Sequence, residues 1–294
     1  MKRMHWKISL HGGHSSEYCD HAQDPLPALV AAAVDAGISI YGITEHAPRF
    51  KTEHMYSEEL ALGWTPEILL NKFRRYAHEL DSLSRIWDSK ITLLKGFEAE
   101  VIPSDSYADK MLSLKRELGF DYIVGSVHYV NGISIDYTRA LFGEAVQRCG
   151  SLENLCVAYF QTVRNMAEAL RPEVLGHFDL IRKMAGNTSE LQSAPVLRAA
   201  ENALHSIREI GCIIDINTSP LRKGFACPYP APHFLKMIRE KGIPVCFGDD
   251  SHSAAEVGAG FETARQYLID HGIRELSALN KKSGKMEKET VLLQ

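Results

Sequence analysis

Residues 27–46 read PALVAAAVDAGISIYGITEH, and this stretch sets a pattern that most of the chain repeats. Residues 27–36 are apolar at helical spacing and are followed by a glycine, so they predict a helix that ends at position 37. The next residues, ISIYGIT, predict a short buried strand that ends beside Glu45 and His46. A helix followed by a strand therefore forms the first clear unit of the fold.

Helices and strands alternate in the same way along almost the whole chain. Further helices are expected at 65–87, 106–118, 152–169, 194–210 and 232–241. The strands that follow them are ITLLKGFEAEVI (91–102), FDYIVGSVHYV (120–130), VLGHFDLIRK (174–183), CIIDINTS (212–219) and IPVCFGDDSH (243–252). With WKISLH (6–11) as the first strand, this alternation predicts an α/β fold with a parallel sheet, either closed into a barrel or open and doubly wound.

No internal repeat, low-complexity tract or Gly/Ser linker divides the 294 residues. We therefore expect one domain over residues 1–294, with residues 275–294 as a flexible C-terminal tail. Hydrophobic residues make up 45% of the chain and charged residues 24%, which is typical of a globular protein with a large core. The six cysteines are scattered without a C-x-x-C pair, so neither a zinc ribbon nor a disulfide framework is expected.

Charge and hydropathy limit the kinds of partner. The chain has 33 Lys and Arg against 37 Asp and Glu, a formal charge of -4, and no run of five basic residues, so a nucleic-acid partner is not expected. No apolar run approaches 18 residues and the N-terminus lacks the apolar segment of a signal peptide. The sequence therefore predicts a cytoplasmic protein that binds a small molecule and no membrane, and it leaves the oligomeric state open.

Histidines and carboxylates gather where the predicted strands end, which is where the chemistry of a parallel barrel takes place. These residues are His11, His14 and His21, Glu45 and His46, Glu98 and Glu100, His128, His177 with Asp179, Asn217, and Asp250 with His252. Imidazole and carboxylate ligands suit zinc, manganese and iron, and this set exceeds what one tetrahedral ion can use. A multinuclear metal centre is therefore predicted, and hydrolysis of a phosphate ester is its natural reaction.

Two arginines follow strand ends and complete this arrangement. Arg182 lies five residues after His177, and Arg222 lies five residues after Asn217. A guanidinium group can donate two parallel hydrogen bonds to two phosphate oxygens, and it keeps its charge at any working pH. Both arginines are therefore candidates for holding a phosphoryl group. The alternative is that they form ordinary surface ion pairs.

Six segments in order resemble the polymerase-and-histidinol-phosphatase (PHP) superfamily, and more narrowly its histidinol-phosphate phosphatases. They are GITEHAP, KGFEAEV, DYIVGSVHYVNG, LGHFDLIRK, DINTSPLRKG and GDDSHSAAEVG. The resemblance runs from residue 11 to residue 252 and implies a distorted (β/α)7, TIM-like barrel with three divalent ions of zinc, manganese or iron at its C-terminal mouth.

The resemblance also implies the reaction. The expected activity is hydrolysis of L-histidinol phosphate to L-histidinol and phosphate in histidine biosynthesis, by a metal-bridging hydroxide and without a covalent phosphoenzyme. Two alternatives stay open. One is a PHP phosphoesterase that acts on nucleotides or another small phosphate, and the other is a PHP module without catalytic activity. The segments HFDLIRK and NTSPLRK favour histidinol phosphate.

Carried over position by position, the resemblance assigns a role to each candidate residue. The first ion would be bound by His11, His14 and Asp250, with Glu98 bridging to a second ion held by His128 and His177. The third would be bound by His21, His46 and His252. Glu98, Asp250 and His252 are the candidate catalytic residues. Arg182, Arg222 and Glu17 are the candidate substrate-binding residues, Glu17 lying in SSEYCDH, which looks like the family's EFC-x-H.

Two segments depart from the family pattern. The first motif usually reads His-x-His, whereas this chain reads His11-Gly12-Gly13-His14, so a local bulge is needed to bring His14 to the metals. The last motif, often Ser-Asp-Ala-His, here begins with two carboxylates, Asp249 and Asp250. The register assigns metal binding to Asp250, and Asp249 is left as a ligand, a partner of a histidine or a plain strand-end residue.

Overall fold

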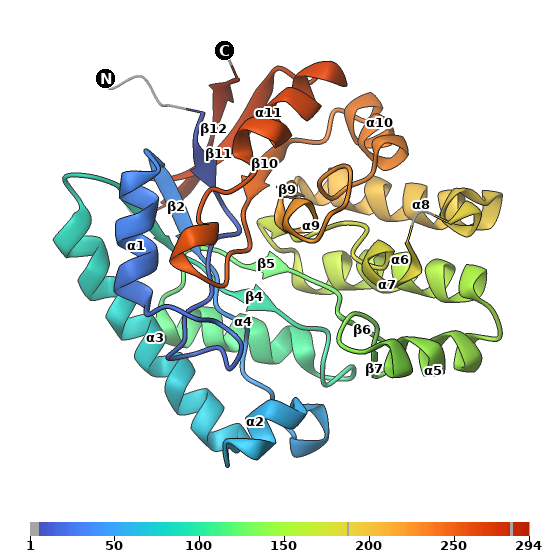
Figure 1. Cartoon of the computed structure of the whole chain (residues 1–294), viewed down its shortest axis with the longest axis horizontal. Coiled ribbons are helices and arrows are strands. Elements are labelled where there is room, and N and C mark those ends of the chain that lie inside the picture. The colour runs from blue at the N-terminus through green and yellow to red at the C-terminus, as the bar shows by residue number, and fades with distance from the viewer. Residues whose placement is uncertain (1–5, 187, 283–284, 294) are drawn as a thin grey trace.

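The computed structural model describes residues 6–186, 188–282 and 285–293, and Figure 1 shows its strands surrounded by helices. The parallel strands are β1 (Ile8–Ser9), β2 (Ile40–Ile43), β3 (Thr92–Lys95), β4 (Glu98–Ala99), β5 (Val124–Gly125), β8 (Val174–Leu175), β9 (Ile213–Asn217) and β10 (Val245–Gly248). Two antiparallel hairpins add β6 (Tyr129–Val130) with β7 (Ile133–Ser134), and β11 (Glu275–Lys282) with β12 (Lys285–Leu292). The predicted α/β class with parallel sheets is confirmed.

The parallel strands form two sheets that meet at both edges. One sheet has the order β1-β2-β3 and the other β10-β9-β8-β5-β4. A parallel bridge between His46 and Glu98 joins the end of β2 to β4, and a second between His11 and Gly248 joins the end of β1 to β10. Since β3 and β4 are consecutive parts of one extended segment, these bridges close a ring of seven strand positions within the described residues. This closure favours the barrel over the open sheet.

The predicted helices are present, each within one residue of the expected ends. They are α1 (Leu26–Asp35), α3 (Pro66–Trp87), α4 (Tyr107–Leu118), α6 (Leu152–Leu170), α8 (Ala194–Ile210) and α10 (Pro232–Glu240). The structure adds α2 (Ser57–Ala61), α5 (Arg139–Cys149), α7 (Arg182–Ala185), α9 (Ser219–Arg222) and α11 (Phe261–Asp270), with 3-10 turns at Thr52–His54, Ser189–Gln192 and Ala254–Glu256. Most of these added elements lie between the predicted units, but α7 begins within the predicted strand 174–183, of which only β8 is a strand, and α11 follows the last predicted strand.

Local sequence explains where several helices begin and end. Thr65 precedes α3, and its side-chain oxygen accepts a hydrogen bond from the backbone N–H of Ile68, which satisfies a free donor of the first turn. Glycines with positive φ follow α4 and α8, at Gly119 and Gly211. Because glycine adopts this left-handed backbone without strain, both helices stop before the next strand.

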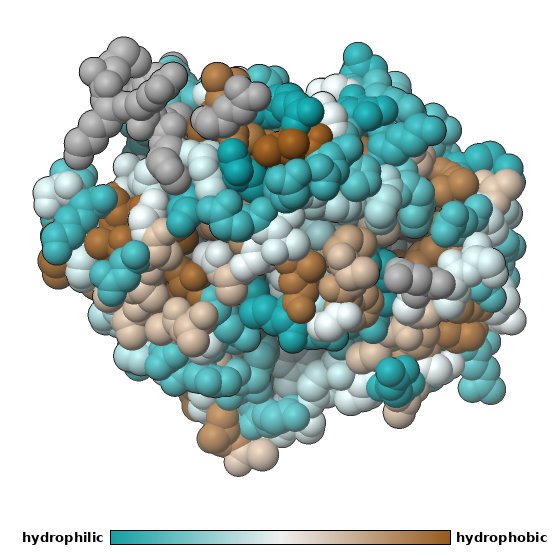
Figure 2. Space-filling model, turned by 45° about the horizontal axis from the view of Figure 1, so that its top comes forward, coloured by the Kyte–Doolittle hydropathy of each residue, from teal (hydrophilic) through white to brown (hydrophobic). Residues whose placement is uncertain are grey.

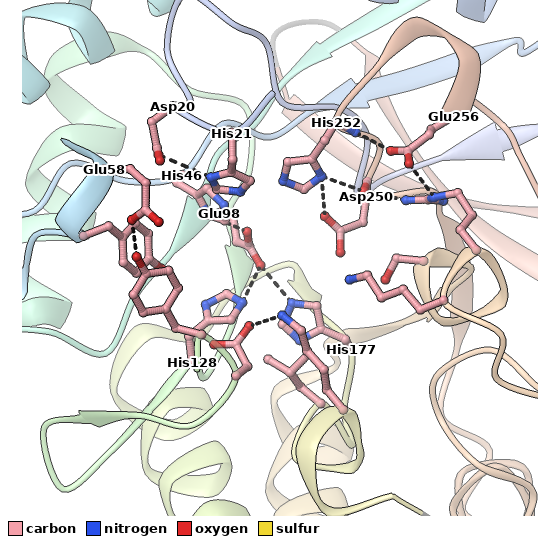
Figure 3. A pocket seen from close by; sticks show the side chains of 18 residues that line it. Asp20, His21, His46, Glu58, Glu98, His128, His177, Asp250, His252 and Glu256 are labelled. Atoms are coloured by element: carbon pink, nitrogen blue, oxygen red, sulfur yellow. Dashed lines mark hydrogen bonds and ion pairs between the residues drawn. The ribbon is translucent and has the colours of Figure 1, made fainter. Parts of the chain in front are cut away.

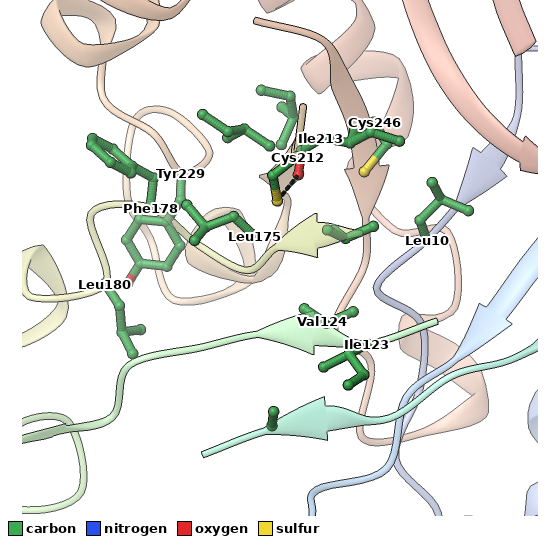
Figure 4. Close-up of a cluster of buried hydrophobic side chains, with 14 of the residues drawn as sticks. Leu10, Ile123, Val124, Leu175, Phe178, Leu180, Cys212, Ile213, Tyr229 and Cys246 are labelled. Carbon is green, nitrogen blue, oxygen red and sulfur yellow. Dashed lines mark hydrogen bonds between the residues drawn. The ribbon is translucent and has the colours of Figure 1, made fainter. Parts of the chain in front are cut away.

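Buried apolar side chains pack around the ring strands. Leu10, Val124, Leu175, Ile213 and Cys246 are buried and come together from five strand segments (Figure 4). On the outside, hydrophilic residues dominate the face in Figure 2, and apolar residues form small separate patches there. Among the described helices, none has the length and apolar character needed to cross a bilayer.

The expectation of a flexible tail at 275–294 is wrong for the described residues. β11 and β12 pair in antiparallel register, and Leu276 and Val291, which face each other across the pair, are buried. Lys281 Nζ donates to Asp121 Oδ1 at 2.7 Å, just before β5, and Lys288 donates to the Gly211 carbonyl, just before β9. The hairpin therefore packs at the amino-terminal ends of the strands, and the described part of this segment belongs to the folded structure.

Candidate metal centre

The histidines and carboxylates of the candidate site all lie at the carboxyl ends of the ring strands. His11 follows β1, His46 follows β2, Glu98 lies in β4, and His128 and His177 follow β5 and β8. Asp250 and His252 follow β10 in the same way. His177 and Asp250 have φ angles of +22° and +47°, a conformation that non-glycine residues seldom adopt. Such backbone strain is concentrated at functional sites, where it aims a side chain.

Glu98 is the centre of the cluster. Its Oε1 lies 3.0 Å from His177 Nε2, 3.4 Å from His11 Nε2 and 3.7 Å from His128 Nε2. Its Oε2 lies 2.8 Å from His46 Nδ1. Figure 3 shows this carboxylate pointing into the space between the rings. Glu98 is 1% exposed, so its carboxylate contacts the four histidines and almost no water.

Two further carboxylates fix the orientation of the rings. Asp215 Oδ2 lies 2.8 Å from His11 Nδ1, and Glu100 Oε1 lies 2.6 Å from His128 Nδ1. A carboxylate on one ring nitrogen is the usual support of a metal-binding histidine, because it leaves the other nitrogen free to coordinate. In both residues that other nitrogen, Nε2, faces Glu98. The sequence analysis missed Asp215, although its spacing of two from Asn217 places both on one face of a strand.

The Gly-Gly insertion in the first motif brings His14 into the cluster. A side-chain carbon on Gly12 would lie 2.4 Å from the Gly42 carbonyl oxygen, and one on Gly13 would lie 2.8 Å from Ser251 Oγ, so both positions need glycine. The backbone N–H of His14 donates to the Ser251 carbonyl at 2.7 Å. Its Nε2 then lies 3.3 Å from Asp250 Oδ1. The extra residue is thus accommodated by close packing against β2 and the segment after β10.

His14 also stacks between the histidines expected at the third ion. Its ring centroid lies 4.2 Å from that of His46 and 4.5 Å from that of His252. His21 stacks on His252 at 4.7 Å and is more exposed than the others. A buried thiol, Cys19, has its sulfur within 4.8 Å of ligand atoms of His14, His46 and His252. The structure therefore brings together the predicted His21, His46 and His252, and adds a cysteine that the ligand prediction did not include.

The donor atoms fit bound cations. Buried ring nitrogens without a hydrogen-bond partner include His11 Nε2, both nitrogens of His14, and His252 Nε2. Groups of donors lie close enough to share an ion, among them His11, His14 and Glu98, and a second formed by Glu98, His128 and His177. Buried polar atoms normally have a partner, so a group of unpartnered ring nitrogens close to buried carboxylates is the expected form of a metal centre.

The carboxylates of the cluster are in the charge state that binds metals. Burial opposes charge on Glu98, yet its pKa lies well below the ordinary value because His11, His128 and His46 surround it. Asp250 is partly buried, which opposes its charge, but the neighbouring rings of His14, His11 and His252 hold its pKa well below the ordinary range. Burial lowers the pKa of His252 to about 3, and His14 adds to the effect. Burial opposes charge on His11, His14 and His128 as well, but the neighbouring carboxylates raise the pKa of each, that of His128 to about 10. A divalent ion would therefore have to displace protons from these rings, since the neutral imidazole is the form that binds metals.

Asp249 lies outside the metal cluster. Its Oδ1 accepts from Ser9 at 2.6 Å, and its Oδ2 accepts from Tyr41 at 3.2 Å and from the N–H of Gly258 at 3.0 Å. With these donors satisfied inside the barrel wall, Asp249 supports the strand end, and Asp250 faces the histidines. This arrangement agrees with the register assigned from the sequence.

The cluster opens into a pocket of about 440 Å³ whose lining includes Ser219, Lys183, Arg222 and Lys223. Arg222 Nε lies 3.3 Å from Glu256 Oε1, and its other nitrogens donate to the carbonyls of Asp249 and Asp250 at 2.9 Å. Arg222 therefore both lines the pocket and fixes the turn that carries Asp250.

Arg182 and Glu17 are not among the described residues that line this pocket. Arg182 is 1% exposed, donates to the Pro228 carbonyl at 2.8 Å and pairs with Asp179 at 3.3 Å, so its guanidinium is used inside the protein. Glu17 accepts a hydrogen bond at 3.2 Å from the N–H of Leu26, at the start of α1. The structure therefore gives both side chains partners within the protein, away from the described pocket lining. Lys183 and Lys223, each next to a predicted arginine, are pocket cations that the sequence analysis missed.

Comparisons with known proteins agree with the fold and the site. The PHP domain matches residues 11–219. A protein of Schizosaccharomyces pombe named "Probable histidinol-phosphatase" is 35% identical, and the alignment covers 93% of this chain and 90% of that protein. The histidinol-phosphatase of Saccharomyces cerevisiae is 28% identical, with 88% of each chain covered.

A solved structure has the same fold. It is the histidinol phosphate phosphatase of Lactococcus lactis complexed with zinc, L-histidinol and phosphate, with a TM-score of 0.68 and 17% identity over 96% of this chain and 99% of that one. At this identity the likeness concerns the fold. Together with the matched domain and the yeast relatives, it leads to one conclusion: this chain belongs to the PHP domain family.

Proposed function

We propose that this protein is a metal-dependent phosphomonoesterase that hydrolyses L-histidinol phosphate to L-histidinol and phosphate, as in histidine biosynthesis. One observation carries the proposal. A buried carboxylate, Glu98, faces four histidines at the base of a pocket whose rim bears three cationic side chains. The names of the yeast relatives support the substrate, as do the L-histidinol and phosphate bound by the Lactococcus lactis enzyme.

The residues present would hold three divalent ions of zinc, manganese or iron. We assign His11, His14 and Asp250 to the first ion, Glu98 as a bridge to the second, His128 and His177 to the second, and His21, His46 and His252 to the third. When bound, such ions supply hydroxide near neutral pH by lowering the pKa of water, and they offset charge on phosphoryl oxygens. The zinc of the Lactococcus lactis enzyme supports divalent metals in this position.

The protein's own groups would position the metal ligands and the phosphate. Asp215 and Glu100 hold the rings of His11 and His128 so that their Nε2 atoms face Glu98. Lys183, Arg222 and Lys223 place positive charge at the rim, where the phosphate of a monoester would lie. Burial and the neighbouring cations Lys183 and Arg222 lower the pKa of Lys223, as expected for an ammonium group in a partly enclosed basic site.

Phosphate release measured on three substrates tests the proposal. Protein treated with a chelator is assayed with L-histidinol phosphate, a nucleoside monophosphate and p-nitrophenyl phosphate, before and after Mn or Zn is restored. We expect turnover only with metal, with kcat/KM for L-histidinol phosphate of at least about 10⁴ M⁻¹s⁻¹ and far above the others. A preference for the nucleotide would move the substrate to another small phosphate, and lack of turnover with any substrate would favour a module without catalysis.

A further inference from the structure

The pocket has charges of opposite sign on its two sides. Lys183, Arg222 and Lys223 supply positive charge on one side, and Arg222 lies beside Glu256. Across the histidine cluster from Glu256 lie the carboxylates of Asp20 and Glu58 (Figure 3). A phosphomonoester held by its phosphate on the basic side would therefore extend the rest of the molecule toward the acidic side.

Glu58 differs from the other carboxylates of this pocket because no cationic side chain among the described residues pairs with it. Asp20 pairs with His21 at 3.2 Å, Asp136 with Lys183 at 2.9 Å and Glu256 with Arg222 at 3.3 Å. Glu98 and Asp250 face the histidines. Within the described part of the chain, no Lys, Arg or His forms an ion pair with Glu58. Its negative charge is thus available to a ligand.

Glu58 is also held in place. The Tyr137 hydroxyl donates to Glu58 Oε2 and lies 2.7 Å from Ser57 Oγ. This hydrogen bond from Tyr137 keeps the pKa of Glu58 below its ordinary value, so the carboxylate is ionised at neutral pH. The ring of Tyr137 lies 4.9 Å from that of Tyr56, and the Arg49 guanidinium lies 4.4 Å from the centre of the Tyr56 ring. These contacts fasten α2 to the loop after β7 and fix the carboxylate at the pocket wall.

We propose that Glu58, with the ring of Tyr137, binds the positively charged end of the substrate and makes the enzyme selective for phosphomonoesters that also carry a cation. The inference rests on the proposed function, because the pocket must first hold the phosphate. A carboxylate forms charge-assisted hydrogen bonds with an ammonium group, and an aromatic ring such as that of Tyr137 attracts a cation to its face. L-Histidinol phosphate carries an ammonium and an imidazole, whereas p-nitrophenyl phosphate carries neither, so the two substrates separate this contact from phosphate binding.

The test compares Glu58→Gln with wild-type protein on both substrates. The amide keeps the size of the side chain and can still accept from Tyr137, but it removes the charge. We expect the ratio of kcat/KM for L-histidinol phosphate over p-nitrophenyl phosphate to fall about tenfold or more, mainly through KM. Inhibition by L-histidinol should weaken by a similar factor, and inhibition by inorganic phosphate should weaken far less.

Glu53→Gln is the matched control. Glu53 precedes α2 by a few residues, is 68% exposed and lies outside the described pocket lining, so its loss of charge should leave the ratio at the wild-type value. An unchanged ratio in Glu58→Gln, or an equal fall in both variants, overturns the inference while wild-type turnover of L-histidinol phosphate still stands. Failure of the wild-type protein to hydrolyse L-histidinol phosphate would instead reject the proposed function.

Discussion

Neighbouring side chains at the pocket have different roles. In Arg182-Lys183 the arginine is buried against Asp179 and the lysine lines the pocket. In Arg222-Lys223 the arginine bonds to the carbonyls of Asp249 and Asp250, and the lysine has no ion pair with any described residue. At the residue scale, we therefore expect binding of the substrate phosphate to depend on the two lysines, and the stability of the fold to depend on Arg182.

Lys223→Met and Arg182→Met separate these roles. Lys223→Met should raise KM for p-nitrophenyl phosphate by up to about tenfold with little change in unfolding, because it removes a charged partner of the phosphate. Arg182→Met should lower the free energy of unfolding by about 3–5 kcal/mol, since it leaves the buried carboxylate of Asp179 without its cation. Steady-state kinetics and urea unfolding measure the two effects. A stable Arg182→Met with a raised KM would place Arg182 at the substrate after all.

The sequence predicted the histidines of the site well, because each follows an apolar run at a strand end. The sequence could not show which of Arg182 and Lys183 faces the pocket. Consecutive residues on a helix point about 100° apart, so only the packing of α7 decides which side chain faces the pocket. Asp215 was missed for a related reason. It lies inside the apolar run CIIDINTS, and nothing local shows that its carboxylate faces His11.

Among the elements, the helices and strands of the main repeat were predicted, whereas those outside the repeat were not. The ends of α8 are predicted to the residue because its apolar side chains recur at helical spacing and a glycine follows. The sequence analysis missed α5, although its apolar residues recur at helical spacing and pack against the core: Leu141, Phe142, Ala145, Val146 and Cys149. Residues 275–294 looked like a tail because the repeat of helix and strand ends before them. Their signal is instead the alternation of buried Leu276 and Ala278 with polar residues, which is typical of a strand.

The β11–β12 hairpin gives a prediction at this scale. Leu276→Ala should lower the free energy of unfolding by about 2–5 kcal/mol, because it leaves a cavity under a leucine that is 1% exposed. Leu292→Ala is the same substitution in the same hairpin, but Leu292 is 60% exposed and should change stability little. Urea unfolding compares the two variants. Equal stability in both would mean that the hairpin does not pack on the barrel in solution.

For the whole molecule, ions bound at the candidate metal centre would link the chain segments that meet at the mouth of the barrel. The donors of this centre come from β4 and from the segments after β1, β2, β5, β8 and β10, which lie far apart in the sequence and meet only when the ring is closed. A cation that binds this arrangement binds the folded chain and has much lower affinity for the unfolded one. Metal binding is therefore coupled to the stability of the entire fold, as well as to catalysis.

Metal removal should consequently weaken the protein globally. Protein stripped of metal by a chelator should unfold at a lower urea concentration than metal-loaded protein. Mn or Zn at about 100 times its dissociation constant should raise the free energy of unfolding by roughly 2.7 kcal/mol for each site that it fills. Glu98→Gln should reduce this gain, because Glu98 faces both the His11 side and the His128 side of the cluster. Glu53→Gln, which removes an exposed carboxylate, should retain the full gain. An identical response of all three proteins to metal would mean that the ions bind elsewhere, and the assignment of Glu98 as the bridging ligand would then be wrong.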